Sequence, residues 1–236
     1  MKIKKKEIKF FANNDFILNS CLPPVSAKQT IPKWYKNANR YTYGDKLIIQ
    51  DNGGTNVGVK VCVPFLDAIT NGYTIRLHCD ILVEWDENGQ FHLKWTSNEK
   101  PLSSRSEAVS SQIPTLSGYT GFTQAWELKY SFVVPRGYSV LVTQPLNGFD
   151  LPTYVTSGIM DSDDFCGPGG IPFAIRKDFS GIIKAGTPIM QLIPIKRDKW
   201  KSSLKVQTLE QESGLGPRNY IVGWYKENIW KRKSYE

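Results

Sequence analysis

The sequence predicts a single, mainly-β domain that carries an extension at each end, and three observations lead to this prediction. At 236 residues the chain has the length of one large domain. Hydrophobic residues make up 40% of it, which is enough to fill a core. Its 19 glycines and 14 prolines are spread along the whole chain, as expected for many short strands joined by turns.

Four regions follow from the distribution of apolar, basic and turn residues along the chain. Residues 1–24 contain a basic start and a first strand, and residues 25–58 form an arm and a loop. Residues 59–200 form the β core, and residues 201–236 form a helical, basic tail. No segment repeats internally, so the prediction is one core with extensions rather than an array of similar units.

The first two regions contain one strand and one short helix. Residues 7–19 alternate between apolar and polar side chains and predict a strand. In the arm, Pro32 favours the start of a helix that carries Trp34 and Tyr35, because proline is common at the first helical position. These rings either pack the arm onto the β core or lock it onto a neighbouring subunit. Residues 51–58 are rich in Asn and Gly and predict a loop.

The clearest alternation in the core runs over residues 73–85, where six apolar side chains share one face of a single predicted strand. Residues 86–89 predict a hairpin turn, and residues 91–95 the return strand. Further strands are expected at 126–134, 138–144, 153–160, 171–176 and 188–195. Because these strands have the strongest apolar pattern, we expect them to bury Leu141, Ile159, Ile189, Leu192 and Ile193.

The remaining segments predict loops and short helices. Residues 59–65 form either a short strand or the lead into a helical turn at 66–69. Residues 96–121 are rich in Ser, Gly and Thr and predict a long surface loop. A turn is expected at 178–186, and helices are expected at 203–212 and 224–234.

The chain is basic, with a formal net charge of +8 that is concentrated toward both ends. Such ends are either solvated and flexible, or they contact nucleic acid or an acidic surface of a partner. No apolar run approaches the roughly 18 residues that a membrane-spanning helix needs, and no signal peptide is evident, so no membrane partner is expected.

The cysteines and histidines predict neither a metal site nor a cofactor. No two cysteines have the CxxC spacing of a zinc or redox motif, which favours buried free thiols in a reducing compartment. The run His78, Cys79, Asp80 contains three possible ligands, but neighbouring residues on a strand point to opposite faces. A zinc site there needs two further convergent ligands. The four cysteines are Cys21, Cys62, Cys79 and Cys166.

Four segments share their order and spacing with a known superfamily. They are GYTI at 72–75, PRGYS at 135–139, SGIMD at 157–161 and GTPIMQ at 186–191. In this order they resemble the core motifs of the trimeric dUTPase and dCTP-deaminase superfamily. The resemblance implies a distorted β-barrel or jelly-roll-like core. It also implies that Asp161 matches the carboxylate that orients the attacking water.

The positions that hold phosphates in that superfamily differ in this chain. The run PLNG at 145–148 stands in the place of a Pro-Arg-Ser-Gly motif, and Leu146 has no side-chain donor for a phosphate. Without the Arg, the two parallel hydrogen bonds that a guanidinium donates to a phosphate are lost. Thr74 stands where the family has an Asp, and the glycine-rich motif that closes over the nucleotide has no counterpart near the C-terminus.

A wider pattern combines IPKWYK at 31–36 and CVPFLDA at 62–68 with the segments above. The combination is similar to a family of uncharacterised bacteriophage-encoded proteins, and the similarity covers most of residues 25–200. The resemblance implies a phage origin and brings no enzymatic activity with it.

From these patterns we expect a non-enzymatic structural protein of the virion, capsid-associated or part of the neck or tail, made in the host cytoplasm. Its expected partners are other virion proteins and further copies of itself. The candidate interface residues are Trp34, Tyr35, Trp224 and Trp230, because aromatic side chains with few apolar neighbours in sequence are frequent anchors of interfaces.

Two alternatives stay open. A divergent deoxynucleotide pyrophosphatase or deaminase would use Asp161 and Asp163 as its catalytic residues, whereas in a structural protein they cap a turn or end a strand. A host-directed binding module is the second alternative.

Overall fold

The computed structural model describes residues 6–164, 167, 169–206 and 222–236. It is mainly β, with 31% strand and 16% helix, which confirms the predicted fold class at this level. The strands are β1 Lys9–Ala12, β2 Val25–Ser26, β3 Tyr73–Arg76, β4 Ile81–Trp85, β5 Phe91–Trp95, β6 Leu102–Ser104, β7 Gln124–Glu127, β8 Tyr130–Val133, β9 Tyr138–Thr143, β10 Thr153–Val155, β11 Gly158–Met160, β12 Gly170–Ile175, β13 Gly181–Ile183 and β14 Pro188–Lys196. The helices are α1 Asp15–Ser20, η1 Ala27–Thr30, α2 Lys33–Asn37, η2 Val59–Val61, α3 Val63–Thr70, α4 Glu107–Ser110 and α6 Trp224–Asn228.

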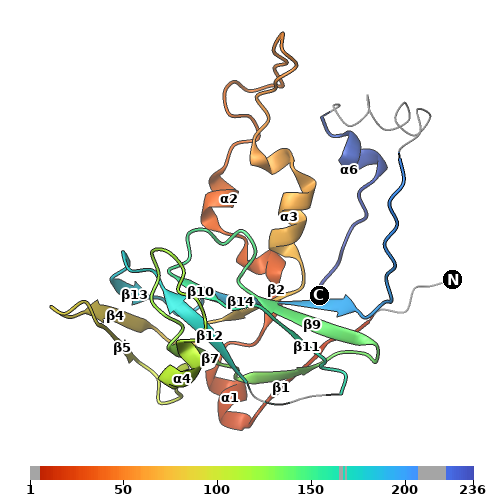
Figure 1. The fold of residues 1–236 in the computed structure, drawn as a ribbon. Coiled ribbons are helices and arrows are strands. Elements are labelled where there is room, and N and C mark those ends of the chain that lie inside the picture. The colour runs from red at the N-terminus through yellow and green to blue at the C-terminus, as the bar shows by residue number, and fades with distance from the viewer. Residues whose placement is uncertain (1–5, 165–166, 168, 207–221) are drawn as a thin grey trace.

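The strands form antiparallel sheets that pack around one core (Figure 1). The largest sheet has five strands in the order β11-β9-β14-β3-β2, and a second has four in the order β10-β12-β7-β6. Strands β13, β4 and β5 form a third sheet, and β1 pairs with β8. Among the described residues these sheets close no barrel, although a distorted barrel is the form that the resemblance implies.

The central strand of the five-stranded sheet is β14, which pairs with β9 on one side and β3 on the other. Residues 189–193 of this strand are all buried, as expected for an apolar run covered on both faces. The pairing brings the four motif segments together, since β3, β9, β11 and β14 carry GYTI, PRGYS, SGIMD and GTPIMQ in turn. Segments far apart in the sequence therefore share one sheet.

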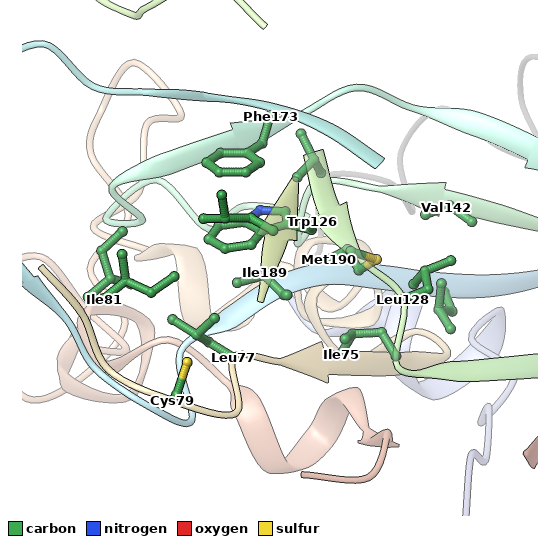
Figure 2. Close-up of a cluster of buried hydrophobic side chains, with 14 of the residues drawn as sticks. Ile75, Leu77, Cys79, Ile81, Trp126, Leu128, Val142, Phe173, Ile189 and Met190 are labelled. Carbon is green, nitrogen blue, oxygen red and sulfur yellow. The ribbon is translucent and has the colours of Figure 1, made fainter. Parts of the chain in front are cut away.

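The core is centred on two stacked aromatic rings (Figure 2). Trp126 of β7 and Phe173 of β12 lie nearly parallel, with ring centroids 3.9 Å apart, and neither side chain reaches solvent. Aliphatic side chains from the other sheets surround them, including Leu77, Ile81, Val83, Met190 and Leu192. Three of the five expected core residues, Ile189, Leu192 and Ile193, are buried as predicted.

The prediction that Ile159 and Leu141 are buried is wrong. Ile159 is 65% exposed and Leu141 is half-buried. The register aligns Ile159 with Leu141 and Leu141 with Ile193, on the face opposite the core residues Val140 and Val142. Ile193 is covered because it lies on the central strand, whereas β11 is the edge of the sheet.

Three of the predicted strands are each divided between two sheets. Residues 73–85 form β3 and β4, because the chain bends between them and both Leu77 and Asp80 bond to the loop that precedes β14. In the same way residues 126–134 contain parts of β7 and β8, and residues 153–160 contain β10 and β11. An alternating pattern defines which face a residue occupies, but it does not define its pairing partner.

Several segments have more helix or strand than predicted. The strand predicted over 7–19 ends at β1, because the Asn14 side chain accepts the Ile17 N–H at 2.9 Å and caps α1. The predicted surface loop at 96–121 contains β6 and α4, and the predicted turn at 178–186 contains β13. The hairpin of β4 and β5 forms as predicted.

The arm and the C-terminal tail lie on one side of the sheets, where Figure 1 shows α2, α3 and α6, whereas β1 and α1 lie on the opposite side. Helix α2 begins directly after Pro32, and the lead into a helix is the correct alternative for residues 59–65, since η2 and α3 lie there. Helix α6 confirms the first half of the helix predicted at 224–234. Residues 203–206 have no regular structure, and the rest of the helix predicted at 203–212 lies outside the described residues. Within the described part of the chain, no helix has the length and apolar character needed to cross a membrane.

Candidate functional site

The two candidate catalytic carboxylates lie just after β11, where they meet an arginine from the end of β14. The Asp163 carboxylate accepts the Gly137 N–H at 2.8 Å and pairs with the Arg197 guanidinium through both oxygens, the contact to Nη1 measuring 2.8 Å. The backbone N–H of Arg197 in turn donates to the Gly137 carbonyl at 2.9 Å. Asp163 thus ties the turn before β9 to the residue that follows β14.

Asp161 belongs to the same cluster but lies nearer to solvent. Its carboxylate accepts a hydrogen bond from the Ser139 hydroxyl at 2.6 Å and lies 3.2 Å from Nη1 of Arg197. The Asp161 side chain is 68% exposed, whereas that of Asp163 is 1% exposed. We call Arg197, Asp163, Asp161, Ser139 and Gly137 the Arg197 clamp. Both carboxylates in it already have partners from their own chain.

The clamp changes the acidity of its inner carboxyl. The hydrogen-bonded Arg197 guanidinium, followed by the Gly137 N–H, lowers the pKa of Asp163 from its usual 3.8 to about 2. A carboxyl that is this acidic stays ionised at neutral pH and cannot serve as a general acid there. Asp163 is therefore suited to holding strands together rather than to transferring protons.

This lowered pKa predicts how the clamp responds to acid. The unfolded carboxyl titrates near 3.8 and the folded one near 2, so its stabilising effect is complete above about pH 4 and is lost as the pH falls toward 2. We expect Asp163→Asn to lower the free energy of unfolding at pH 7 and to flatten its decline between pH 4 and 2. Urea unfolding across that range measures both effects. The control is Asp45→Asn, at an exposed Asp that forms no ion pair among the described residues. An unchanged acid profile in the Asp163 variant would contradict the prediction.

The loop that takes the place of the phosphate-binding motif is also occupied by its own chain. The backbone N–H of Leu146 donates to Oε1 of Gln191 at 2.8 Å. The Gln191 side-chain amide donates to the carbonyls of Ala68 at 3.0 Å and Asn71 at 2.5 Å. Gln191 is 1% exposed, so this bridge joins β14, the end of α3 and the loop inside the protein. A backbone donor that a phosphate would use is thereby already satisfied.

A cavity of about 520 Å³ lies beside this loop, between the arm and the sheet. Thr74, Leu146 and Gln191 line it, so three of the segments that were compared with the superfamily motifs meet at one cavity. Neither Asp161 nor Asp163 lines it. The structure therefore does not bring the candidate catalytic carboxylates and the candidate phosphate loop together around one cavity.

The His78, Cys79, Asp80 run has separate contacts for each residue. The His78 ring lies 3.2 Å from the Glu99 carbonyl, Cys79 is buried in the core, and Asp80 pairs with Lys184 at 2.9 Å. Within the described residues, no three His, Cys, Asp or Glu side chains are grouped so that they could hold a metal ion.

The first two candidate interface residues pack against their own chain. Tyr35 is buried and stacks on Phe65 of α3, with ring centroids 6.0 Å apart. Trp34 contacts the same Phe65 edge-on at 6.0 Å and Phe149 at 5.7 Å. The arm is thus held to α3 and to the loop after β9 by a cluster of aromatic rings. Of these, Phe149 is 72% exposed.

The other two candidate interface residues lie in the tail. The Trp230 indole N–H donates to the Asp67 carboxylate of α3 at 2.8 Å, and Lys233 pairs with the same carboxylate. Near the end of the chain, Tyr235 packs edge-on against Tyr73. Trp224 begins α6 and is half-buried. The end of the tail therefore lies against α3 and β3 rather than free in solvent.

The strongest exposed apolar feature was not among the candidate residues. Residues 197–206 follow β14 without regular secondary structure, and Trp200, Leu204 and Val206 on this segment are 91%, 101% and 94% exposed. In the sequence they stand singly among Lys, Ser and Gln, so no apolar run marks them, and Leu204 and Val206 fall within the helix predicted at 203–212.

No protein-family model matches the sequence of this chain, and no curated protein matches it either.

Proposed function

We propose that this chain is a non-enzymatic structural subunit of a bacteriophage particle, with a core related to that of the dUTPase superfamily. The observation that carries the proposal is the almost complete exposure of Trp200, Leu204 and Val206 on segment 197–206. Burying apolar surface is worth about 25 cal/mol per Å². Three large apolar side chains exposed to water on one segment therefore favour a surface that a neighbouring subunit covers.

The non-enzymatic part of the proposal is supported by the contacts of the candidate catalytic residues. Hydrolysis of a nucleoside triphosphate needs a carboxylate that orients water and donors that neutralise phosphate. Here Arg197 holds both Asp161 and Asp163, and the Leu146 N–H donates to Gln191. These contacts fit a core that resembles the superfamily in the order of its motifs and uses its polar residues for stability.

The experiment that tests this function is mass spectrometry of purified particles of the virus that encodes the chain. We expect the wild-type chain to be present as a particle component. A variant with Trp200, Leu204 and Val206 all changed to Ser is expected to remain folded, because these side chains have almost no contacts to lose, and to be absent from particles. Circular dichroism of the purified variant checks its fold.

The matched control changes two polar residues of the same segment, Lys201→Ser and Lys205→Ser, and is expected to enter particles normally. Absence of the wild-type chain from particles would refute the structural role. Normal incorporation of the triple Ser variant would refute the assignment of the interface to residues 197–206.

A further inference from the structure

A basic groove lies between the arm, α3 and the C-terminal tail, on the side of the molecule where Figure 1 shows α6 beside α3. It encloses about 830 Å³. Its lining includes six basic residues and two acidic ones, Asp67 and Glu227, a net charge of +4. Half of the chain's formal excess of +8 is therefore gathered around one groove. The basic residues are Lys28, Arg40, Lys60, Lys226, Arg232 and Lys233.

Most of this charge is not neutralised within the protein. The Asp67 carboxylate is already occupied by Lys233 and by the Trp230 indole N–H. Among the described residues, the other five basic side chains form no ion pair with a carboxylate, and all of them are exposed. Lys60 donates to the Lys36 carbonyl at 2.7 Å, a neutral partner that leaves its charge uncompensated.

The convergence of the charge depends on the fold. Lys28 lies on η1, Lys60 on η2 and Lys226 on α6, while Arg232 lies beyond α6. The contact of the tail with Asp67 brings Lys226 and Arg232 to the same groove as Lys28 and Lys60. Like charges placed together in this way repel each other, so an anion bound between them relieves an unfavourable interaction.

We propose that this basic groove binds the phosphodiester backbone of a nucleic acid. A single small phosphate is bound best by fixed donors that converge on it, whereas these are exposed side chains on separate segments. Such distributed cations suit a polyanion, which gains affinity at each phosphate by releasing counterions. Two aromatic side chains, Trp230 and Tyr235, also line the groove and offer surfaces on which bases stack. This inference does not depend on the proposed role in a particle.

The test measures binding of a fluorescein-labelled single-stranded oligothymidylate by fluorescence anisotropy over a series of KCl concentrations. The variant combines Lys28→Gln, Lys226→Gln and Arg232→Gln. For a single strand each lost phosphate contact lowers the salt slope by about 0.7, so three lost contacts lower it by about 2. At about 0.1 M salt this corresponds to roughly 100-fold weaker binding.

A matched control makes the same change in net charge elsewhere, with Lys9→Gln, Lys100→Gln and Lys177→Gln. These lysines are exposed, form no ion pair among the described residues and do not line the groove. We expect the control to bind within about threefold of wild type, because lysines outside the groove make no direct contact with the bound phosphates and salt screens their longer-range effect. Equal losses in the two variants would overturn the proposal, since binding would then follow total charge.

A second measurement uses the unmodified chain. Mild acetylation followed by mass spectrometry should show that oligothymidylate protects Lys28, Lys60 and Lys226 but leaves Lys9 and Lys100 reactive. No binding to oligothymidylate or to duplex DNA at low salt would overturn the proposal. The proposal would also be overturned if polyglutamate displaced the labelled oligothymidylate as well as unlabelled oligothymidylate of the same charge does. The groove would then be a site for acidic proteins.

Discussion

Replacing Trp126 with Ala is expected to lower the free energy of unfolding by about 3–5 kcal/mol, the usual cost of removing a large aromatic side chain from a packed core. Trp126 is fully buried and stacks on Phe173 at 3.9 Å. Its indole N–H has no hydrogen-bond partner among the described residues, so the loss comes from packing and the cavity left behind. Urea unfolding measures the change.

The control for this prediction is the same substitution at the surface. Trp200 is 91% exposed, and Trp200→Ala is expected to change the free energy of unfolding by no more than about 0.5 kcal/mol. Equal effects of the two substitutions would mean that the stacked pair of Trp126 and Phe173 is not the centre of the core.

The second large effect is expected at Gly72, which precedes β3. Its φ is +69°, and a Cβ added there would lie 2.0 Å from the Leu192 carbonyl oxygen on the central strand. Because the obstacle is backbone, it cannot move as a side chain would. We expect Gly72→Ala to lower the free energy of unfolding by about 2–5 kcal/mol, from backbone strain together with overpacking. Urea unfolding again measures it.

Gly89 provides a control that separates these two causes. Its φ of +72° is almost the same, but a Cβ there would have nothing within 4 Å. Gly89→Ala is therefore expected to cost about 1 kcal/mol, from backbone strain alone. If Gly72→Ala cost no more than Gly89→Ala, the close approach of Gly72 to Leu192 would be refuted.

Local patterns predicted the parts of the fold that depend on neighbours in sequence. The hairpin over 81–95 and the start of α2 after Pro32 each follow from turn or helix signals within a few residues. The division of 73–85 into two strands depends instead on Leu77 and Asp80 bonding to the loop before β14, more than 100 residues later. Alternation alone carries no information about such a contact.

The candidate site, too, was predicted only in part, because its contacts join residues far apart in the sequence. Asp161 was found from its motif and Asp163 from its place two residues later, but their partner Arg197 stands 34 residues beyond Asp163, after a strand where no motif marks it. Gln191 was part of a motif, yet its role appears only when α3 and the Leu146 loop are placed around it. In both cases the contact joins residues far apart in the sequence, so no local pattern indicates it.

The docking of the tail through Asp67 has a thermodynamic consequence for the basic groove. Three of the six groove cations, Lys226, Arg232 and Lys233, lie on the tail, so an anion that spans the groove binds the docked tail more tightly than a detached one. By linkage, such a ligand and the tail must each favour the other by the same factor. Hydrogen exchange of the α6 amides should therefore slow as ligand is added. The exchange rate of these amides would then measure the fraction of grooves that hold a ligand.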